Sequence, residues 1–241
     1  ELATDIELVI KNAISVGIEK ILMPAIDSAS LEAMLKVEQQ FPDHCIAMMG
    51  LHPCYVKANV QEELAHVKSW LDKRDFVAVG EIGLDFYWDK TFAEEQKTSF
   101  IQQCTWAAEL DLGVSIHTRS ATYEAISALK TIKQKPKGVF HCFSGSSESA
   151  KQIVDLGFYL GIGGVITYKN AGLPEALENI SLSHLVLETD APYLTPVPFR
   201  GKRNESGYLL YIAEKLAEVK QTTLQEVATI TTANAQKIFG S

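Results

Sequence analysis

Short apolar runs alternate with segments of helical spacing along the whole chain, and this alternation constrains the fold more than any other feature. Strands that alternate with helices indicate a parallel sheet. The runs are nearly all apolar, which is typical of strands covered on both faces. The predicted strands are residues 18–26, 45–51, 76–80, 114–116, 139–143, 158–162 and 185–189.

The helical segments complete a repeating unit. They are residues 2–16, 27–40, 60–74, 92–110, 121–131, 147–156, 171–180, 207–219 and 223–239. We therefore predict an α/β fold of the TIM-type (β/α)8 barrel class, with the first strand missing from this chain because it precedes Glu1. No linker or shift in composition divides the 241 residues, so we expect a single domain over 1–241.

A doubly wound open sheet is the alternative fold. Such sheets bind ligands at one switch point, often beside a Gly-rich GxGxxG turn. This chain has no such turn after a strand, and polar residues follow nearly every predicted strand. Both observations favour the barrel.

Composition limits the partners. The net charge is −8 and the pI is about 5.3, whereas proteins that coat a nucleic-acid backbone are usually basic. A small site that acts on the end of a strand stays possible. No apolar run reaches the ~20 residues of a membrane span, so no membrane partner is expected. The four cysteines form no CxxC pair, which favours a reducing, cytoplasmic compartment.

Four residues with metal-binding side chains follow four different predicted strands. They are Glu81, His117, His141 and Asp190. In a barrel, side chains at the C-terminal ends of the strands line the active site. Two imidazoles and two carboxylates suit a divalent ion, and a carboxylate can bridge two ions. Each residue alone is more often structural, but the four together predict a metal site.

The sequence around these residues resembles the TatD family of metal-dependent deoxyribonucleases. The similar strings are residues 50–53, 80–85, 116–119, 141–145, 188–194 and 200–205, and they occur in order between residues 18 and 239. The resemblance implies a TIM-type barrel and two divalent ions (Mg, Mn or Zn), without an organic cofactor. It also implies an exonuclease-like hydrolysis of phosphodiester bonds in DNA, on single strands or ends.

The resemblance also implies roles for the four residues. Glu81 would be a catalytic ligand that bridges the two ions, and His117 and His141 would be further ligands. Asp190 would be a ligand and the catalytic residue that orients or deprotonates the attacking water. The family carries a His-x-His pair after its first strand, and this sequence contains none. We expect that pair to precede Glu1, and the chain as written to bind metal poorly.

Three further residues are predicted to contact the substrate. His52 could polarise a phosphate oxygen, although a structural role before Pro53 is equally compatible. Arg119 lies two residues beyond His117 and is placed to meet a phosphate, with an ion pair to a nearby carboxylate (Asp85 or Glu81) as the alternative. Arg203 lies in a basic loop after the last predicted strand, although such loops are usually just solvated.

Two aromatic residues, Tyr87 and Trp88, follow Asp85. An aromatic ring there could stack on an unpaired base, or it could pack against the next helix. The sequence leaves both readings open.

Two other functions compete with the nuclease. One is a metal-dependent amidohydrolase acting on a C–N or ester bond. Relatives of that kind often bridge their metals with a modified lysine, and here Glu81 takes that position. The other is a barrel that binds without catalysis, which the presence of four metal-binding residues argues against.

Overall fold

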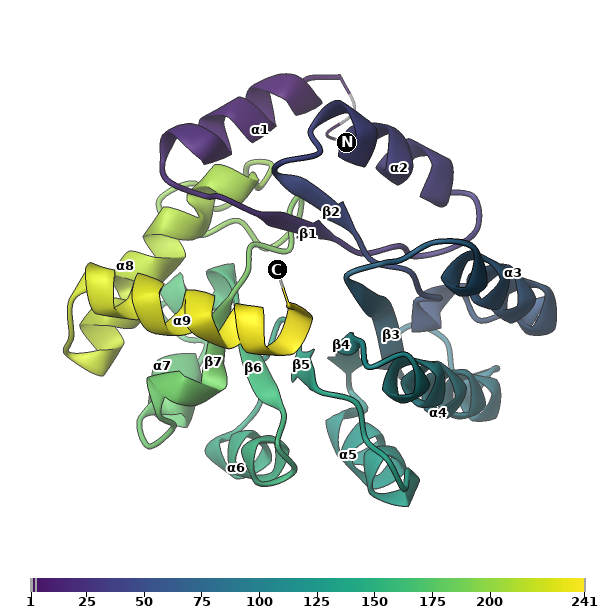
Figure 1. The fold of residues 1–241 in the computed structure, drawn as a ribbon. Coiled ribbons are helices and arrows are strands. Elements are labelled where there is room, and N and C mark those ends of the chain that lie inside the picture. The colour runs from purple at the N-terminus through teal and green to yellow at the C-terminus, as the bar shows by residue number, and fades with distance from the viewer. Residues whose placement is uncertain (1, 3, 241) are drawn as a thin grey trace. The chain divides into compact units, whose positions relative to one another are not determined.

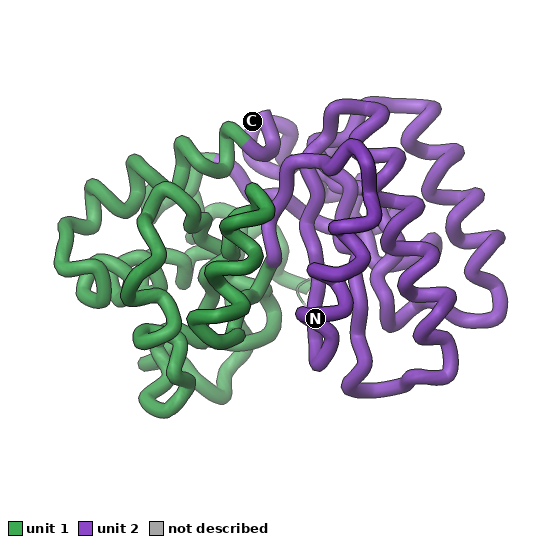
Figure 2. The backbone as a smooth tube through the Cα atoms, turned by 90° about the horizontal axis from the view of Figure 1, so that it is seen from below, with its two compact units in different colours: residues 1–19, 141–237 green, residues 20–140, 238–241 purple. Residues whose placement is uncertain are grey.

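The computed structural model describes residues 2 and 4–240. The chain divides into two compact units, which Figure 2 shows in different colours. One contains residues 20–140 and 238–241, and the other contains residues 1–19 and 141–237. Each predicted strand and helix is present, with small shifts at its ends (Figure 1). The single domain over 1–241 stays a prediction.

The unit of residues 20–140 alternates strands with helices. Its strands are β1 (Ile21–Met23), β2 (Cys45–Ala47), β3 (Ala78–Asp85), β4 (Gly113–Arg119) and β5 (Gly138–Phe140). Its helices are α2 (Leu31–Gln40), α3 (Val60–Lys73), α4 (Ala93–Glu109), α5 (Thr122–Thr131) and the 3-10 turn η1 (Pro53–Tyr55). β1 pairs with β2, and β4 pairs with both β3 and β5, always in parallel. A bridge between Met49 and Val79 joins the two groups.

The unit of residues 1–19 and 141–237 has fewer strands. They are β6 (Tyr159–Ile162) and β7 (Leu185–Leu187), which pair in parallel. Its helices are α1 (Ile6–Ser15), α6 (Ser147–Asp155), α7 (Leu173–Leu177), α8 (Leu209–Lys220) and most of α9 (Leu224–Phe239), with 3-10 turns η2 (Gly164–Thr167), η3 (Leu182–His184) and η4 (Ser206–Tyr208).

β3 is longer than predicted and is buried along its whole length. It stays paired with β4 as far as Asp85 and Arg119, after a register shift between Val79 and Ile82. Glu81 and Asp85 therefore lie inside the strand and not after it, with only 7% and 2% of their surface exposed. Burying a carboxylate costs free energy unless it is hydrogen-bonded or paired with a charge. The partners of Glu81 and Asp85 therefore indicate the function of these two residues.

Gly83 lies between these two carboxylates and brings the backbones of β3 and β4 close together. Its φ is +140°, a conformation that side chains of L-residues rarely adopt. A Cβ at this position would lie 2.0 Å from the carbonyl oxygen of His117. Only glycine fits here, which explains the Glu-x-Gly-x-Asp spacing on β3.

The sequence predicted no membrane-spanning helix and free cysteines, and the structure bears on both points. No described helix is both long and apolar enough to cross a bilayer. The four cysteines, all within the described part of the chain, form no disulfide, and Cys45 and Cys104 are buried.

Candidate metal centre

Three side chains of the unit of residues 20–140 converge on one point. They come from β3 (Glu81), β4 (His117) and the residue before η1 (His52). One possible ligand atom from each lies within 4.8 Å of the others. Nδ1 of His117 is 3.0 Å and Nε2 of His52 is 3.2 Å from the same oxygen, Oε1 of Glu81. The structure thus brings together Glu81 and His117, two of the predicted ligands.

The hydrogen bonds of His117 assign its ring nitrogens. Nε2 lies 3.0 Å from Oδ2 of Asp85. An ionised carboxylate can only accept, so Nε2 carries a proton. In the neutral ring Nδ1 then has the lone pair and lies 3.0 Å from a second acceptor, Oε1 of Glu81, and a cation bound by both atoms satisfies this arrangement. Metal-binding histidines commonly donate their other N–H to a carboxylate in this way, so Glu81 and His117 fit a divalent ion.

His52 belongs to the same cluster but has a different hydrogen-bonding pattern. Its Nδ1 accepts the backbone N–H of Cys54 at 3.1 Å, which caps η1. The neutral ring therefore carries its proton on Nε2, the atom that faces Glu81. His52 thus offers a hydrogen-bond donor to an oxygen, whereas His117 donates to Asp85 through its other nitrogen.

Asp85 connects His117 to the segment that follows β3. While Oδ2 holds the imidazole, Oδ1 accepts the backbone N–H groups of Tyr87 and Trp88 at 3.0 and 3.3 Å. Burial raises the pKa of Asp85, but hydrogen bonds from His117 and from the Tyr87 amide outweigh burial and lower the pKa to about 2. Asp85 shares a face of its strand with Glu81, and that alternation was the sequence signal for its role.

Replacing Asp85 by Asn is expected to weaken the affinity for Mn²⁺ by about 10–100-fold, because a ligand histidine loses its orienting carboxylate. Isothermal titration calorimetry measures this affinity directly. Asp72→Asn is the matched control, since Asp72 pairs with Lys68 on α3. Equal affinities of the Asp85→Asn variant and the wild type would remove Asp85 from the metal centre.

Cys54 lies beside this cluster, which raises the question of a thiol nucleophile. Burial and the neighbouring Asp85 carboxylate raise the pKa of the Cys54 thiol to about 12. Because the thiolate is the reactive species, Cys54 stays protonated and inert at neutral pH.

His141, a predicted ligand in the other unit, also has a carboxylate partner. Its Nδ1 lies 3.3 Å from Oε1 of Glu188, which also accepts the backbone N–H of Cys142 at 2.6 Å. Gly161 on β6 leaves room for that carboxylate, because a Cβ there would lie 2.2 Å from Oε2 of Glu188. Glu188 orients His141 as Asp85 orients His117. Sequence reasoning gave Glu188 no role, although it lies directly after β7 and two residues before Asp190.

Asp190 lies in a fixed turn after β7. Its φ is +56°, in the left-handed region. The fully buried amide of Asn204 donates to the carbonyl oxygens of Thr189 and Tyr193, both at 2.6 Å. These bonds hold the backbone on both sides of Asp190. The joint binding of metal by Glu81, His117, His141 and Asp190 stays a prediction.

Arg203 has structural partners that the sequence did not suggest. Its guanidinium forms two hydrogen bonds to Asp5, at 2.8 and 2.7 Å, and one to Glu205 at 2.8 Å. These carboxylates raise the pKa of Arg203 further above its ordinary value. The bidentate pair joins residues 198 positions apart in the chain, which no local pattern can show. The predicted contact between Arg203 and the substrate stays a prediction.

Arg119 does not form the ion pair that was its structural alternative. The partner of Asp85 is His117, and within residues 2 and 4–240 Arg119 has no ion pair. Its guanidinium lies over two aromatic rings instead, 3.9 Å from the centroid of Tyr87 and 4.9 Å from that of Trp88. Tyr87 and Trp88 are 56% and 70% exposed, so neither ring is buried against α4.

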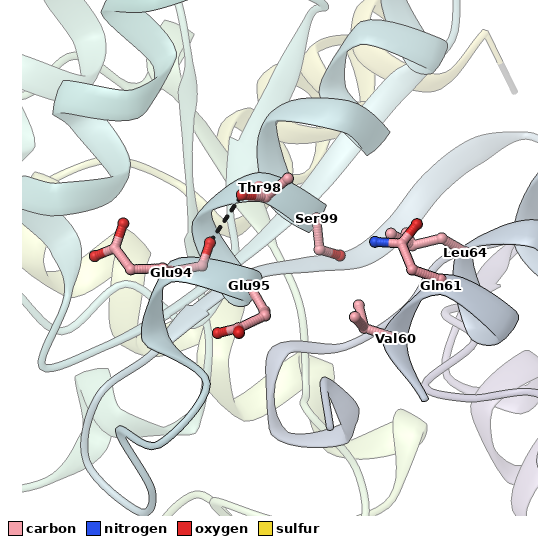
Figure 3. A pocket seen from close by; sticks show the side chains of 7 residues that line it. All are labelled: Val60, Gln61, Leu64, Glu94, Glu95, Thr98 and Ser99. Atoms are coloured by element: carbon pink, nitrogen blue, oxygen red, sulfur yellow. Dashed lines mark hydrogen bonds between the residues drawn. The ribbon is translucent and has the colours of Figure 1, made fainter. Parts of the chain in front are cut away.

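A cavity of about 240 Å³ lies beside α3 and α4. Figure 3 shows the side chains that line it: Val60, Gln61, Leu64, Glu94, Glu95, Thr98 and Ser99. None of them is a predicted site residue, so this cavity is separate from the metal centre.

Comparison with known proteins identifies the family. The family model described as TatD related DNase matches residues 1–240. The metal-dependent hydrolase YabD of Bacillus subtilis (strain 168) is 40% identical over 98% of this chain and 93% of its own length. The 3'-5' ssDNA/RNA exonuclease TatD of Erwinia tasmaniensis is 33% identical over 99% of this chain and 95% of its own.

A solved structure agrees with the sequence matches. The crystal structure of YjjV, a TatD homologue from Escherichia coli K12, matches with a TM-score of 0.92 and 29% identity over 99% of this chain and 93% of that chain. The predicted α/β fold of the TIM-barrel class is thereby confirmed. The fit of Glu81 and His117 for a divalent ion agrees with the description of the relatives as metal-dependent hydrolases. This chain therefore belongs to the TatD family and is a metal-dependent hydrolase.

Proposed function

We propose that the protein is a deoxyribonuclease that releases nucleotides from the end of single-stranded DNA, with two divalent ions (Mg, Mn or Zn) as cofactors. The observation that carries this proposal is the convergence of His52 and His117 on one oxygen of Glu81, at 3.2 and 3.0 Å. In this cluster Glu81 and His117 offer ligand atoms to a cation, and Nε2 of His52 offers a hydrogen bond to an oxygen of the substrate. Relatives named as single-strand exonucleases supply the substrate class.

The proposed chemistry assigns a task to each residue. Glu81, His117, His141 and Asp190 are the residues that would hold the divalent ions. Bound divalent ions supply Lewis-acid charge at the phosphoryl group and acidify water. Asp190 accepts a proton from the attacking water or orients that water for in-line attack. Asp85 and Glu188 keep the two imidazoles in the correct orientation.

The remaining residues bind the substrate. His52 donates its Nε2 proton to a phosphate oxygen, replacing its contact with Glu81, and Arg119 contacts a second phosphate. Arg203 is the third proposed contact, although its bonds to Asp5 and Glu205 favour a structural role. The absence of disulfides among the described residues supports a cytoplasmic location.

Nucleotide release from labelled single-stranded DNA tests the proposal. With Mn²⁺ or Mg²⁺, the full-length protein is expected to shorten the strand one nucleotide at a time, and excess EDTA is expected to stop the reaction. Blocking the 3′ end with phosphorothioate linkages shows the polarity. Hydrolysis of amide or ester substrates in place of DNA would instead favour the amidohydrolase.

A further inference from the structure

The segment after β3 carries an exposed aromatic side chain next to a cation. Trp88 is 70% exposed, and the guanidinium of Arg119 lies 4.9 Å from its centroid. Tyr87 and Trp88 meet edge to face, with an interplanar angle of 87° and centroids 4.8 Å apart. One flat base cannot stack on both rings at once. The guanidinium of Arg119 lies closer to Tyr87, at 3.9 Å, and Trp88 is the more exposed of the two rings, so Trp88 is the ring we consider for stacking.

Tyr87 and Trp88 follow Asp85 directly in the chain, and hydrogen bonds also connect this segment to the candidate metal centre. Asp85 holds His117 with one oxygen and the amides of Tyr87 and Trp88 with the other. The amide of Phe86 donates to the carbonyl oxygen of Arg119 at 2.9 Å. The aromatic pair and the cation are thus the immediate continuation of the two strands that carry Glu81 and His117.

The charge of the protein makes a short-range contact necessary for a nucleic acid. At a net charge of −8, the overall field of the protein repels a polyanion. Base stacking on an aromatic ring works at contact distance and is largely independent of base identity. A single arginine adds one phosphate contact. An exposed tryptophan beside an arginine supplies both.

We propose that Trp88 is a stacking platform for one unpaired base of the strand, while Arg119, held against Tyr87, binds a phosphate next to that base. The proposal deepens the proposed nuclease function and rests on it. It makes Trp88 and Arg119 binding residues for single strands. A base inside a duplex has both faces covered by its neighbours, so Trp88 favours a base that has been released from pairing.

An abasic scan of a short, fluorescently labelled oligothymidine tests the platform. Phosphorothioate linkages slow hydrolysis, and anisotropy gives the affinity in the presence of Mg²⁺. Removing one particular base is expected to weaken binding to the wild type by about 10-fold, the range of a single base–aromatic stack. In the Trp88→Ala variant that position is expected to lose its effect, because the two changes remove the same contact.

Two controls separate stacking from other effects. Trp70 on α3 is the matched tryptophan, because a cation, Lys73, also lies over its ring, at 4.4 Å. The Trp70→Ala variant is expected to lose affinity at the same abasic position as the wild type. Arg119→Ala is expected to lower the slope of log affinity against log salt by about 1, the value for one phosphate contact, whereas Trp88→Ala leaves that slope unchanged.

A spectroscopic readout needs no turnover. The chain has three tryptophans, so Trp70→Phe with Trp106→Phe leaves Trp88 as the only one. Its fluorescence is expected to be quenched by oligothymidine and not by the sugar-phosphate strand without bases. Unchanged fluorescence would contradict the platform.

The outcomes distinguish the platform from the nuclease. A flat abasic scan in a protein that still degrades single-stranded DNA overturns the platform and leaves the nuclease function intact. A protein that neither binds nor degrades any strand removes both. A position-dependent loss that persists in Trp88→Ala overturns the platform as well, because another group then holds the base.

Discussion

The Glu81→Gln variant is expected to lose activity on single-stranded DNA by about 10³-fold, equivalent to about 4 kcal/mol of transition-state stabilisation. The substitution keeps the size of the side chain but removes the negative charge between His52 and His117. Its NH₂ group would also occupy the place of an oxygen that now faces two ring nitrogens. Initial rates of nucleotide release at saturating Mn²⁺ measure the loss.

A thermal unfolding experiment shows whether the loss comes from the metal centre. Glu81 is buried, and without metal its carboxylate carries a desolvation cost that the neutral glutamine avoids. The variant is therefore expected to unfold no earlier than the wild type without metal, and to show no stabilisation by Mn²⁺. Glu95→Gln, at the cavity beside α4, is the control. Retained metal stabilisation in Glu81→Gln would exclude Glu81 as a ligand.

The Asp190→Asn variant is expected to lower kcat by about 10²–10⁴-fold, the range for a residue that takes a proton in the transition state. Asparagine suits the site because it tolerates the left-handed backbone of Asp190, whose φ is +56°. The turn held by Asn204 should therefore remain intact. Circular dichroism checks the fold, and steady-state kinetics separates kcat from KM.

Asp155→Asn is the control for that experiment, because Asp155 pairs with Lys151 on the surface of α6. It is expected to keep wild-type kinetics. If Asp190→Asn turns over DNA at a rate near that of the wild type, Asp190 has no part in the reaction.

The sequence predicted the order of the elements because each β/α unit is local. Apolar runs and helical spacing lie within about twenty residues, and the parallel pairing of neighbours follows from their alternation. The length of β3 was underestimated, since its continuation to Asp85 depends on pairing with β4. That pairing relies on the close backbone approach at Gly83, which no hydrophobic pattern reveals.

The candidate site was predictable to a different degree for each residue. Glu81 and His117 were predicted as metal ligands because residues of metal-binding types directly follow apolar runs in the sequence. Strand alternation puts Asp85 on the face of β3 that carries Glu81, but a carboxylate that orients a histidine, such as Asp85 or Glu188, has no signature of its own in the sequence. The pairing of Arg203 with Asp5 is a long-range contact, so it was missed.

The hydrogen bonds of Asp85 have a consequence for protein engineering. One carboxylate fixes both the tautomer of His117 and the path of the backbone at Tyr87 and Trp88. Insertions or deletions between residues 85 and 88 would therefore disturb cation affinity together with substrate choice. Replacing the aromatic residues at positions 87 and 88 without changing the length of the segment is expected to alter substrate choice while the affinity for the cation is kept.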